Sequence, residues 1–269
     1  MRLYLAFGVS VALVGCGGAE TPKHTLGAIP DVTTTAEPEW LPFMIHAGVP
    51  APLDPREKHL ADVREIAVGG DVARVAWAPD GKHLVVHRAY GDTEIAVTID
   101  LGSVGATAVP VSHPGEPKTR LVRLEHGGAE TAFAPVLSPD RARIAWVREG
   151  SSQGMLIVAS VASETSDARN ELPVLAATSR SPAFLPDSRR IAFASDLDDA
   201  DFQIYVADLD ADRRDGAPPP RVRVTFAEGG ADSPAFSPDG KHIAFVSRRH
   251  DHRGSAERYV YVARWLEDP

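Results

Sequence analysis

Apolar and polar residues alternate along short segments of this chain from about residue 60 onward, which is the period of half-buried β-strands. In one such segment, Ile243, Phe245 and Ser247 would face one side of a strand, and the residues between them the other side. A similar segment occurs four times, and an apolar run follows each copy: Ile95–Ile99, Met155–Ala159, Ile204–Ala207 and Tyr259–Ala263. A shorter run precedes each copy: Arg64–Val68, Leu121–Leu124, Pro173–Ala176 and Arg221–Phe226. No stretch after residue 60 has a helical stripe, so the pattern predicts four units of four short strands each.

A proline–aspartate turn lies within each copy and joins two of its strands. The turns are Pro79-Asp80-Gly81, Pro139-Asp140, Pro186-Asp187 and Pro238-Asp239-Gly240. Proline presets φ for the first central position of a type I turn, Asp suits the second, and Gly supplies the positive φ that follows. We interpret the aspartates as turn formers that bond local backbone N–H groups, rather than as a binding site. Because Arg141 and Ser188 stand where the other turns have Gly, we expect those two turns to be strained or of another type.

The repeat has the length of a propeller blade. The aspartates of successive turns are 60, 47 and 52 residues apart, and repeats near this length form arrays of like units. Four-stranded units in series are typical of a β-propeller, so we predict an all-β fold, a small propeller of about four antiparallel blades. The series begins with an outer strand, Arg64–Val68, and ends with a third strand, Tyr259–Ala263. We expect these N- and C-terminal strands to pair and close the ring, which removes exposed edges; an open arc is the alternative.

Two passages resemble a known repeat. Residues 237–247, Ser-Pro-Asp-Gly-Lys-His-Ile-Ala-Phe-Val-Ser, are similar to the repeat of TolB-type propellers, and Ile204-Tyr205-Val206-Ala207-Asp208 is similar to its third strand. The resemblance covers roughly residues 62–265 and implies the propeller fold. It also implies an association with the Tol–Pal machinery of the bacterial envelope, although no partner-binding motif of that family is visible in the chain. TolB itself resembles a six-bladed propeller with a second, N-terminal domain, whereas four blades are counted here.

The first sixteen residues have the pattern of a secretion signal. Met1-Arg2 precedes an apolar run, Leu3–Val14, whose twelve residues at ~1.5 Å each are too short to span a ~30 Å hydrocarbon core. Leu13-Val14-Gly15 before Cys16 resembles the end of a bacterial lipoprotein signal, which implies that Cys16 becomes the lipidated mature N-terminus. By the same analogy Gly17 favours the outer membrane. The alternatives for Cys16, the only cysteine, are an ordinary buried thiol or a plain signal peptide cut elsewhere.

These features predict three parts: a lipoprotein signal peptide at residues 1–15, a Pro- and Thr-rich tether at 16–60, and the TolB-like propeller at 61–269. Passages such as Thr33–Glu39 carry few core residues and are typical of extended spacers. The segment Trp40–Ile45 interrupts the tether. We interpret this segment as packing on the side of the propeller, with a docking peptide for a partner as the alternative.

The composition limits the partners. With 43% hydrophobic residues, the chain can form one good core. A net charge of −9 argues against nucleic acid, which requires clustered cations, and against attraction of the propeller surface to anionic lipid. We therefore expect contact with a membrane only through the N-terminal lipid.

Several short motifs resemble catalytic or metal-binding motifs, and we interpret each as an ordinary loop. Gly150-Ser151-Ser152-Gln153-Gly154 matches the Gly-x-Ser-x-Gly pattern of hydrolases, but it lies between two strands, without the strand-to-helix turn that such a nucleophile requires. Asp208–Asp212 begins like a calcium loop without its Gly and Glu, and the aspartates of Asp196–Asp201 are typical of a solvated loop, with a weak calcium site as the alternative. His250-Asp251-His252 lies among arginines that oppose zinc. We therefore expect no catalytic residue, metal site or cofactor.

Three functions are compatible with these features. The favoured one is an outer-membrane lipoprotein, facing the periplasm, whose propeller binds a protein or peptide of the cell envelope through its loops without catalysis. The second is a propeller enzyme of the hydrolase or lactonase type with an unrecognised channel site, although no set of Glu, Asn and His recurs at matched positions of the repeats. The third is a spacer or assembly factor without a ligand.

Overall fold

The computed structural model of the protein describes residues 44–68, 71–90, 93–102, 109–110, 132–149, 154–161, 171–175, 178–212, 217–249 and 258–267. The chain divides into two compact units, Met1–Glu39 and Trp40–Pro269, and every described residue belongs to the second. All elements in these ranges are strands, and none of them includes a helix that could cross a membrane.

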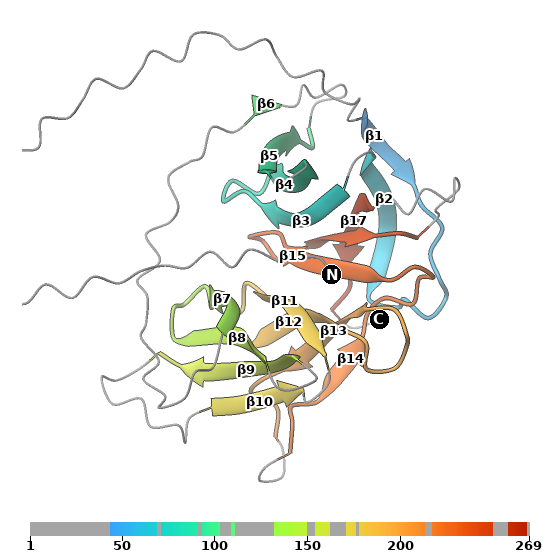
Figure 1. The fold of residues 1–269 in the computed structure, drawn as a ribbon. Helices are drawn as coiled ribbons and strands as arrows, with labels where there is room; N and C mark the ends of the chain where they lie inside the picture. Colours follow the sequence, from blue (N-terminus) through green and yellow to red (C-terminus); the bar gives the residue numbers. More distant parts are fainter. Residues whose placement is uncertain are drawn as a thin grey trace, which may run out of the picture. The chain divides into compact units, whose positions relative to one another are not determined.

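The strands form four antiparallel sheets arranged in a ring as the blades of a β-propeller, which confirms the predicted fold class (Figure 1). The first blade contains β3 (Asp71–Trp77), β4 (His83–Tyr90), β5 (Thr93–Asp100) and β6 (Val109–Pro110). The second contains β7 (Ala132–Leu137), β8 (Arg143–Glu149), β9 (Gly154–Ser160) and β10 (Glu171–Leu175). The third contains β11 (Ser179–Phe184), β12 (Arg190–Ser195), β13 (Gln203–Asp208) and β14 (Arg221–Arg223). The fourth contains β15 (Ala231–Phe236), β16 (His242–Ser247), β17 (Tyr259–Trp265), β2 (Leu60–Val68) and β1 (Met44–Pro50).

The blades meet through their first strands. β3 contacts β15, β15 contacts β11, and β11 contacts β7, so these four strands are the inner ones. The outer strand of the first blade is β6, and the predicted outer run Leu121–Leu124 lies outside the described residues. The other runs expected to follow the turns became β5, β9, β13 and β17.

Both ends of the described chain contribute to the fourth blade. β2 pairs antiparallel with β17, with Val260 opposite Ala67 and Trp265 opposite Leu60. The predicted pairing of the N- and C-terminal strands is therefore confirmed. Because this pairing adds the N-terminal strand to the last blade, the first blade follows directly beside it, and β3 contacts β15, β16 and β17.

The fourth blade also has a fifth strand that the sequence pattern did not predict. β1 lies at the outer edge and pairs with β2, although its residues fall within 16–60, the range interpreted as a tether. Gly48 lets the two strands approach, because its φ is +78° and a Cβ there would lie 2.9 Å from Cδ of Arg64. The strands of this unit therefore begin at Met44, ahead of the predicted boundary at residue 61.

The four proline–aspartate turns have the same backbone geometry. In each, the N–H of the residue after Asp donates to the carbonyl of the residue before Pro, at 2.8–3.0 Å. That residue has a left-handed φ in all four turns: +67° at Gly81, +61° at Arg141, +58° at Ser188 and +72° at Gly240. Two non-glycine residues thus occupy a conformation that disfavours them, and the local strain is of order 1–2 kcal/mol for each. The turns at Arg141 and Ser188 were expected to be either strained or of another type; they are of the same type as the glycine turns, and strained.

The aspartate side chains stabilise these turns locally. The Oδ1 atoms of Asp80, Asp140, Asp187 and Asp239 each accept a hydrogen bond from the backbone N–H two residues later, at 2.8–3.0 Å. The Ser237 hydroxyl lowers the pKa of Asp239, and the Ser138 hydroxyl lowers the pKa of Asp140. These carboxylates are engaged within their own hairpins.

Turns of neighbouring blades also lie next to one another. The N–H of Asp140 donates to Oγ of Ser188 at 3.0 Å, which joins the second and third blades. A Cβ on Gly240 would lie 3.8 Å from Cγ of Pro186, and one on Gly81 would lie 3.7 Å from Cδ of Pro238. The turns therefore gather at one face of the propeller.

The core repeats the same aromatic pair in two blades. Phe193 lies opposite Tyr205 in the third blade, and Phe245 lies opposite Tyr261 in the fourth. Both pairs are stacked, with ring centroids 5.9 and 5.7 Å apart, and all four side chains are buried. Stacked pairs of this kind add about 0.5–1.5 kcal/mol beyond the burial of their area.

We predict that relieving the turn strain stabilises the protein. Arg141→Gly should raise the free energy of unfolding by about 0.5–1 kcal/mol. Glycine adopts the left-handed φ of this position without strain, and the side chain that is removed is exposed. Gly240→Ala should lower the free energy of unfolding by about 1 kcal/mol, since its Cβ meets only an ordinary contact and the φ alone opposes it. Urea unfolding of both variants measures these changes.

Ser188→Gly is the matched control, because it relieves the same φ but removes the Oγ that accepts from Asp140. It should gain less than Arg141→Gly. A loss of stability in Arg141→Gly would contradict the strain assigned to this turn.

Candidate functional site

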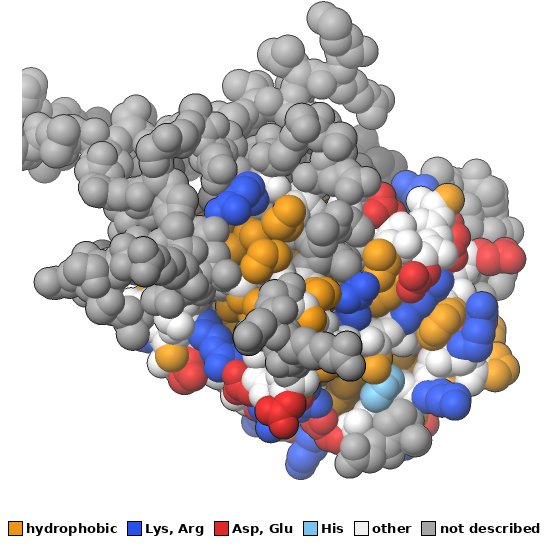
Figure 2. Space-filling model, turned by 90° about the horizontal axis from the view of Figure 1, so that it is seen from below, with side chains coloured by type: hydrophobic (Ala, Val, Ile, Leu, Met, Phe, Trp, Pro, Cys, Tyr) orange, Lys and Arg blue, Asp and Glu red, His pale blue; other side chains and the backbone are white. Residues whose placement is uncertain are grey.

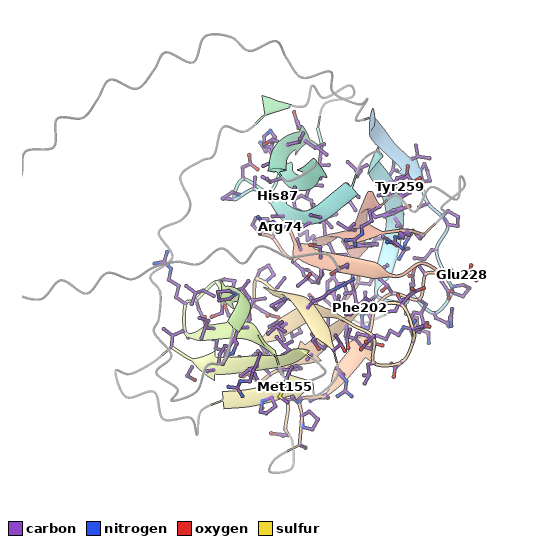
Figure 3. The ribbon with its side chains drawn as sticks, viewed as in Figure 1. Arg74, His87, Met155, Phe202, Glu228 and Tyr259 are labelled. Carbon is purple, nitrogen blue, oxygen red and sulfur yellow. The ribbon has the colours of Figure 1, made fainter. Side chains whose placement is uncertain are left out.

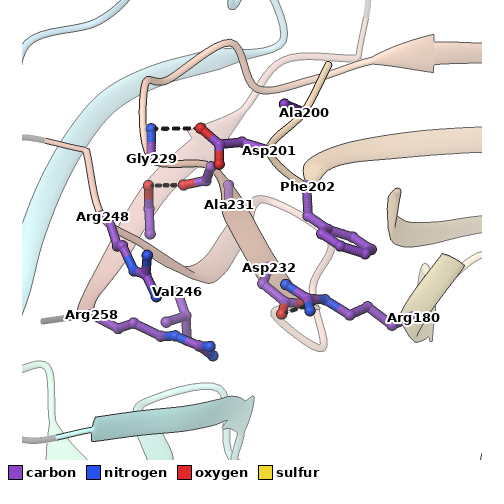
Figure 4. A pocket seen from close by; sticks show the side chains of 12 residues that line it. Arg180, Ala200, Asp201, Phe202, Gly229, Ala231, Asp232, Val246, Arg248 and Arg258 are labelled. Atoms are coloured by element: carbon purple, nitrogen blue, oxygen red, sulfur yellow. Dashed lines mark hydrogen bonds and ion pairs between the residues drawn. The ribbon is translucent and has the colours of Figure 1, made fainter. Parts of the chain in front are cut away.

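A pocket lies at the junction of the third and fourth blades, at the end of the strands opposite the proline–aspartate turns. Its volume is about 210 Å³. It is bounded by the β12–β13 loop, the β14–β15 crossover, the starts of β11 and β15, and the two ends of the β16–β17 loop (Figure 4). The lining residues are Arg180, Ala200, Asp201, Phe202, Gly229, Gly230, Ala231, Asp232, Val246, Ser247, Arg248 and Arg258.

One wall is an ion pair between two inner strands. Nε of Arg180, on β11, lies 2.8 Å from Oδ2 of Asp232, on β15. The Arg180 guanidinium also lies over the ring of Phe202, with its Cζ 3.6 Å from the ring centroid. Figure 3 shows Phe202 between the sheets of the third and fourth blades. The pair and the stacked ring hold this arginine in one place.

The opposite wall is a glycine-rich crossover. Gly229 and Gly230 have φ of +76° and +79°, and a Cβ on Gly230 would lie 2.8 Å from the carbonyl oxygen of Phe202. No larger residue fits there without a shift of the backbone. The N–H of Gly229 donates to Oδ2 of Asp201 at 3.2 Å, and the Ser247 hydroxyl donates to the carbonyl of Gly230 at 2.6 Å. The crossover is thus fixed by packing and by hydrogen bonds.

A buried ion pair fixes the strand end next to the pocket. The guanidinium of Arg249 donates to both carboxylate oxygens of Glu57, at 2.8 and 3.0 Å, and the two side chains are 3% and 0% exposed. The same carboxylate accepts from the N–H of Phe226 at 3.0 Å, and the Tyr261 hydroxyl donates to the carbonyl of Arg249 at 2.7 Å. The pair joins the segment before β2 to the end of β16. Buried pairs of this kind are strongly destabilising to break, by about 3–5 kcal/mol.

Electrostatics in the pocket are dominated by three arginines. The pKa of Arg180 is lowered, chiefly by burial; the charge of Asp232 opposes this shift, and the charges of Arg258 and Arg248 add to it. Arg248 is exposed and Arg258 is half-buried. On the face of the molecule shown in Figure 2, by contrast, basic and acidic side chains are interspersed.

The other acidic candidates are engaged with neighbouring side chains. Asp208 forms two hydrogen bonds with Arg189, at 2.9 and 3.1 Å, and Asp199 pairs with Arg223 at 3.1 Å. The Tyr205 hydroxyl donates to Asp198, and burial together with that carboxylate raises the pKa of Tyr205 to about 12. Among the residues that the structure describes, no group of three or more His, Cys, Asp or Glu could hold a metal ion.

The remaining sequence candidates lie partly outside the structure's described ranges. Cys16, residues 150–153 and residues 250–252 are not among the described residues. Gly154 is the first residue of β9. The turn aspartates lie at the opposite ends of the strands and do not line the pocket.

The fold defines a β-propeller with an arginine-lined pocket at the junction of two blades. The family model described as TolB beta propeller domain matches residues 121–263, more than half of the chain. The chain therefore belongs to the TolB beta-propeller family, and the resemblance seen in the sequence is confirmed. A search of the curated proteins finds no match.

Solved structures similar to this chain include bacterial TolB proteins and a peptidase. TolB from Acinetobacter baumannii is 18% identical over 70% of this chain and 40% of that one, with a TM-score of 0.37. The putative TolB from Agrobacterium tumefaciens is 14% identical over 77% of this chain and 84% of that one, with a TM-score of 0.36. Apo prolyl oligopeptidase B from Galerina marginata is 14% identical over 65% of this chain and 24% of that one, with a TM-score of 0.35. This chain thus spans less than half the length of the first and the third.

Proposed function

We propose that the protein is a non-catalytic binding module of the bacterial cell envelope, whose propeller binds a protein or peptide through the face that carries the pocket. The arginine-lined pocket carries this proposal, because three guanidinium groups gather there in a chain whose net charge is −9. Such a local reversal of sign favours an acidic partner and steers its approach. Loops on a rigid scaffold are also where binding residues concentrate.

The state of the polar groups in the pocket supports binding rather than catalysis. Asp232 is paired with Arg180, and Asp201 accepts from the N–H of Gly229. The hydroxyl of Ser247 is buried and donates to a carbonyl, so it is not poised as a nucleophile. A general base requires a group within hydrogen-bond reach of a reacting proton, and the two carboxylates of the lining are already engaged.

The N-terminal sequence supports the location. Leu13-Val14-Gly15 before Cys16 resembles a lipoprotein signal, and a lipid on Cys16 would hold the propeller at the periplasmic side of the outer membrane. The family membership is consistent with an envelope location, since TolB-type propellers are associated with the Tol–Pal machinery.

The binding face is tested by photo-crosslinking in intact bacteria that express the full chain. A photoreactive residue at Ala200, exposed on the rim of the pocket, should form an adduct with one defined envelope protein, identified by mass spectrometry. The same residue at Arg141, exposed on the turn face, is the matched control and should not form that adduct. Equal adducts from both positions, or none from Ala200, would contradict the proposal.

Anchoring is tested separately by Cys16→Ser. Without the thiol no lipid is attached, so the variant should leave the membrane fraction, whereas Gly17→Ala should remain in it. Cell fractionation followed by immunoblotting measures the distribution. A Cys16→Ser protein that stays in the membrane fraction would rule out the lipid anchor.

A further inference from the structure

Several arginines near the pocket already have partners. Arg180 is paired with Asp232, and Arg249 is held by Glu57. Arg223 pairs with Asp199, and its Cζ lies 4.4 Å from the ring centroid of Phe226. These guanidinium groups are positioned by the fold itself, so a ligand would have to displace an existing partner to use them fully.

Arg248 and Arg258 differ from this group. Both line the pocket, and within the described ranges neither forms a side-chain hydrogen bond or ion pair. Arg248 directly follows β16, and Arg258 directly precedes β17, so the two side chains come from opposite ends of one loop. Figure 4 shows the Arg258 side chain extending past Val246 toward the Arg180–Asp232 pair.

The backbone around these two arginines limits their movement. A Cβ on Gly229 would lie only 2.9 Å from Cβ of Arg248, so the stem of Arg248 packs closely on the crossover. Tyr259, which follows Arg258, is 5% exposed and belongs to the core of the fourth blade. Two cations that line one pocket repel each other, and an anion between them would relieve that repulsion.

The charge and size of the pocket select the kind of anion. Three arginines and two aspartates line it, which leaves one net positive charge and matches a monoanion better than a phosphate dianion. A volume of about 210 Å³ is below the ~300–1,000 Å³ that is usual for small-molecule sites, so it suits one acidic group rather than a cofactor. Guanidinium groups match carboxylates in geometry and donate to both oxygens.

We propose that this pocket binds a carboxylate of a peptide, held by the guanidinium groups of Arg248 and Arg258. The inference rests on the proposed function, because it names the chemical group by which the binding face recognises its partner. The carboxylate belongs either to an Asp or Glu side chain or to the C-terminus of the peptide, and the two sources are distinguished below.

The test is isothermal titration calorimetry on the full chain with four probes. Two acidic probes are acetyl-Gly-Gly-Asp-Gly-Gly-amide, which has a side-chain carboxylate, and acetyl-pentaglycine, which has a C-terminal one. The neutral probe is acetyl-Gly-Gly-Asn-Gly-Gly-amide, and the fourth is inorganic phosphate. We expect at least one acidic probe to bind about tenfold more tightly than the neutral probe and phosphate, and the tighter acidic probe identifies the source.

The double variant Arg248→Gln/Arg258→Gln should bind the acidic probe about tenfold more weakly, because both guanidinium groups are lost. Arg221→Gln, on the outer strand β14 away from the pocket, is the control and should bind like the wild type. Equal binding of neutral and acidic probes, tighter binding of phosphate, or unchanged binding by the double variant would each overturn the assignment. If the double variant unfolds, Arg248→Gln alone, at an exposed position, replaces it with the same criterion.

The outcome is separable from that of the proposed function. A specific crosslink from Ala200 without carboxylate binding would leave the binding face in place and overturn only the chemistry assigned to the pocket. Carboxylate binding lost in the double variant, without any crosslink in cells, would support the pocket chemistry and count against the envelope partner.

Discussion

The pairing of β2 with β17 is the constraint on which the rest of this structure depends. It builds the last blade from both ends of the described chain, and it places the first blade beside the fourth. Without β2, β17 would be left with a row of unpaired backbone groups along one edge. The N-terminal strand satisfies these groups. The buried pair of Glu57 and Arg249 then fixes the segment that leads into it.

The same constraint shapes the pocket. Arg249 turns inward to meet Glu57, whereas Arg248, one residue earlier, is exposed at the pocket. As the chain leaves β16, Ser247 and Arg249 are buried and Arg248 between them is exposed, so the inward position of one arginine leaves the other outward. Arg258 directly precedes β17, which pairs with β2 along its length. The strand that closes the ring, β17, thus also directs one arginine of the pocket.

Much of the fold could be predicted from the sequence, because the same strand and turn pattern occurs four times. The period-two alternation, the proline–aspartate turns and the order of outer and inner strands were sufficient to predict the blades and their closure. The strand β1 could not be predicted, since its proline-containing segment has the composition of a spacer and forms a strand only because β2 offers an edge. The shared turn geometry at Arg141 and Ser188 could not be predicted either, because the hairpin around each turn outweighs the preference of one residue.

The pocket could not be predicted from the sequence, for a different reason. Its lining comes from five separate segments, and the ion pair beside it joins residues that are 192 positions apart. Neither the repeat nor local spacing carries such information. Arg248 and Arg249 look alike in a run of basic residues, and only the position of Glu57 separates their roles.

Native-state hydrogen exchange of the full chain tests the closure of the ring most directly. If β2 completes the fourth blade, its backbone amides that bond to β17 exchange only through global unfolding, at the same free energy as those of β16. If β2 amides exchange at a free energy several kcal/mol below those of β16, the N-terminal strand is a detachable segment, and the closed ring is wrong.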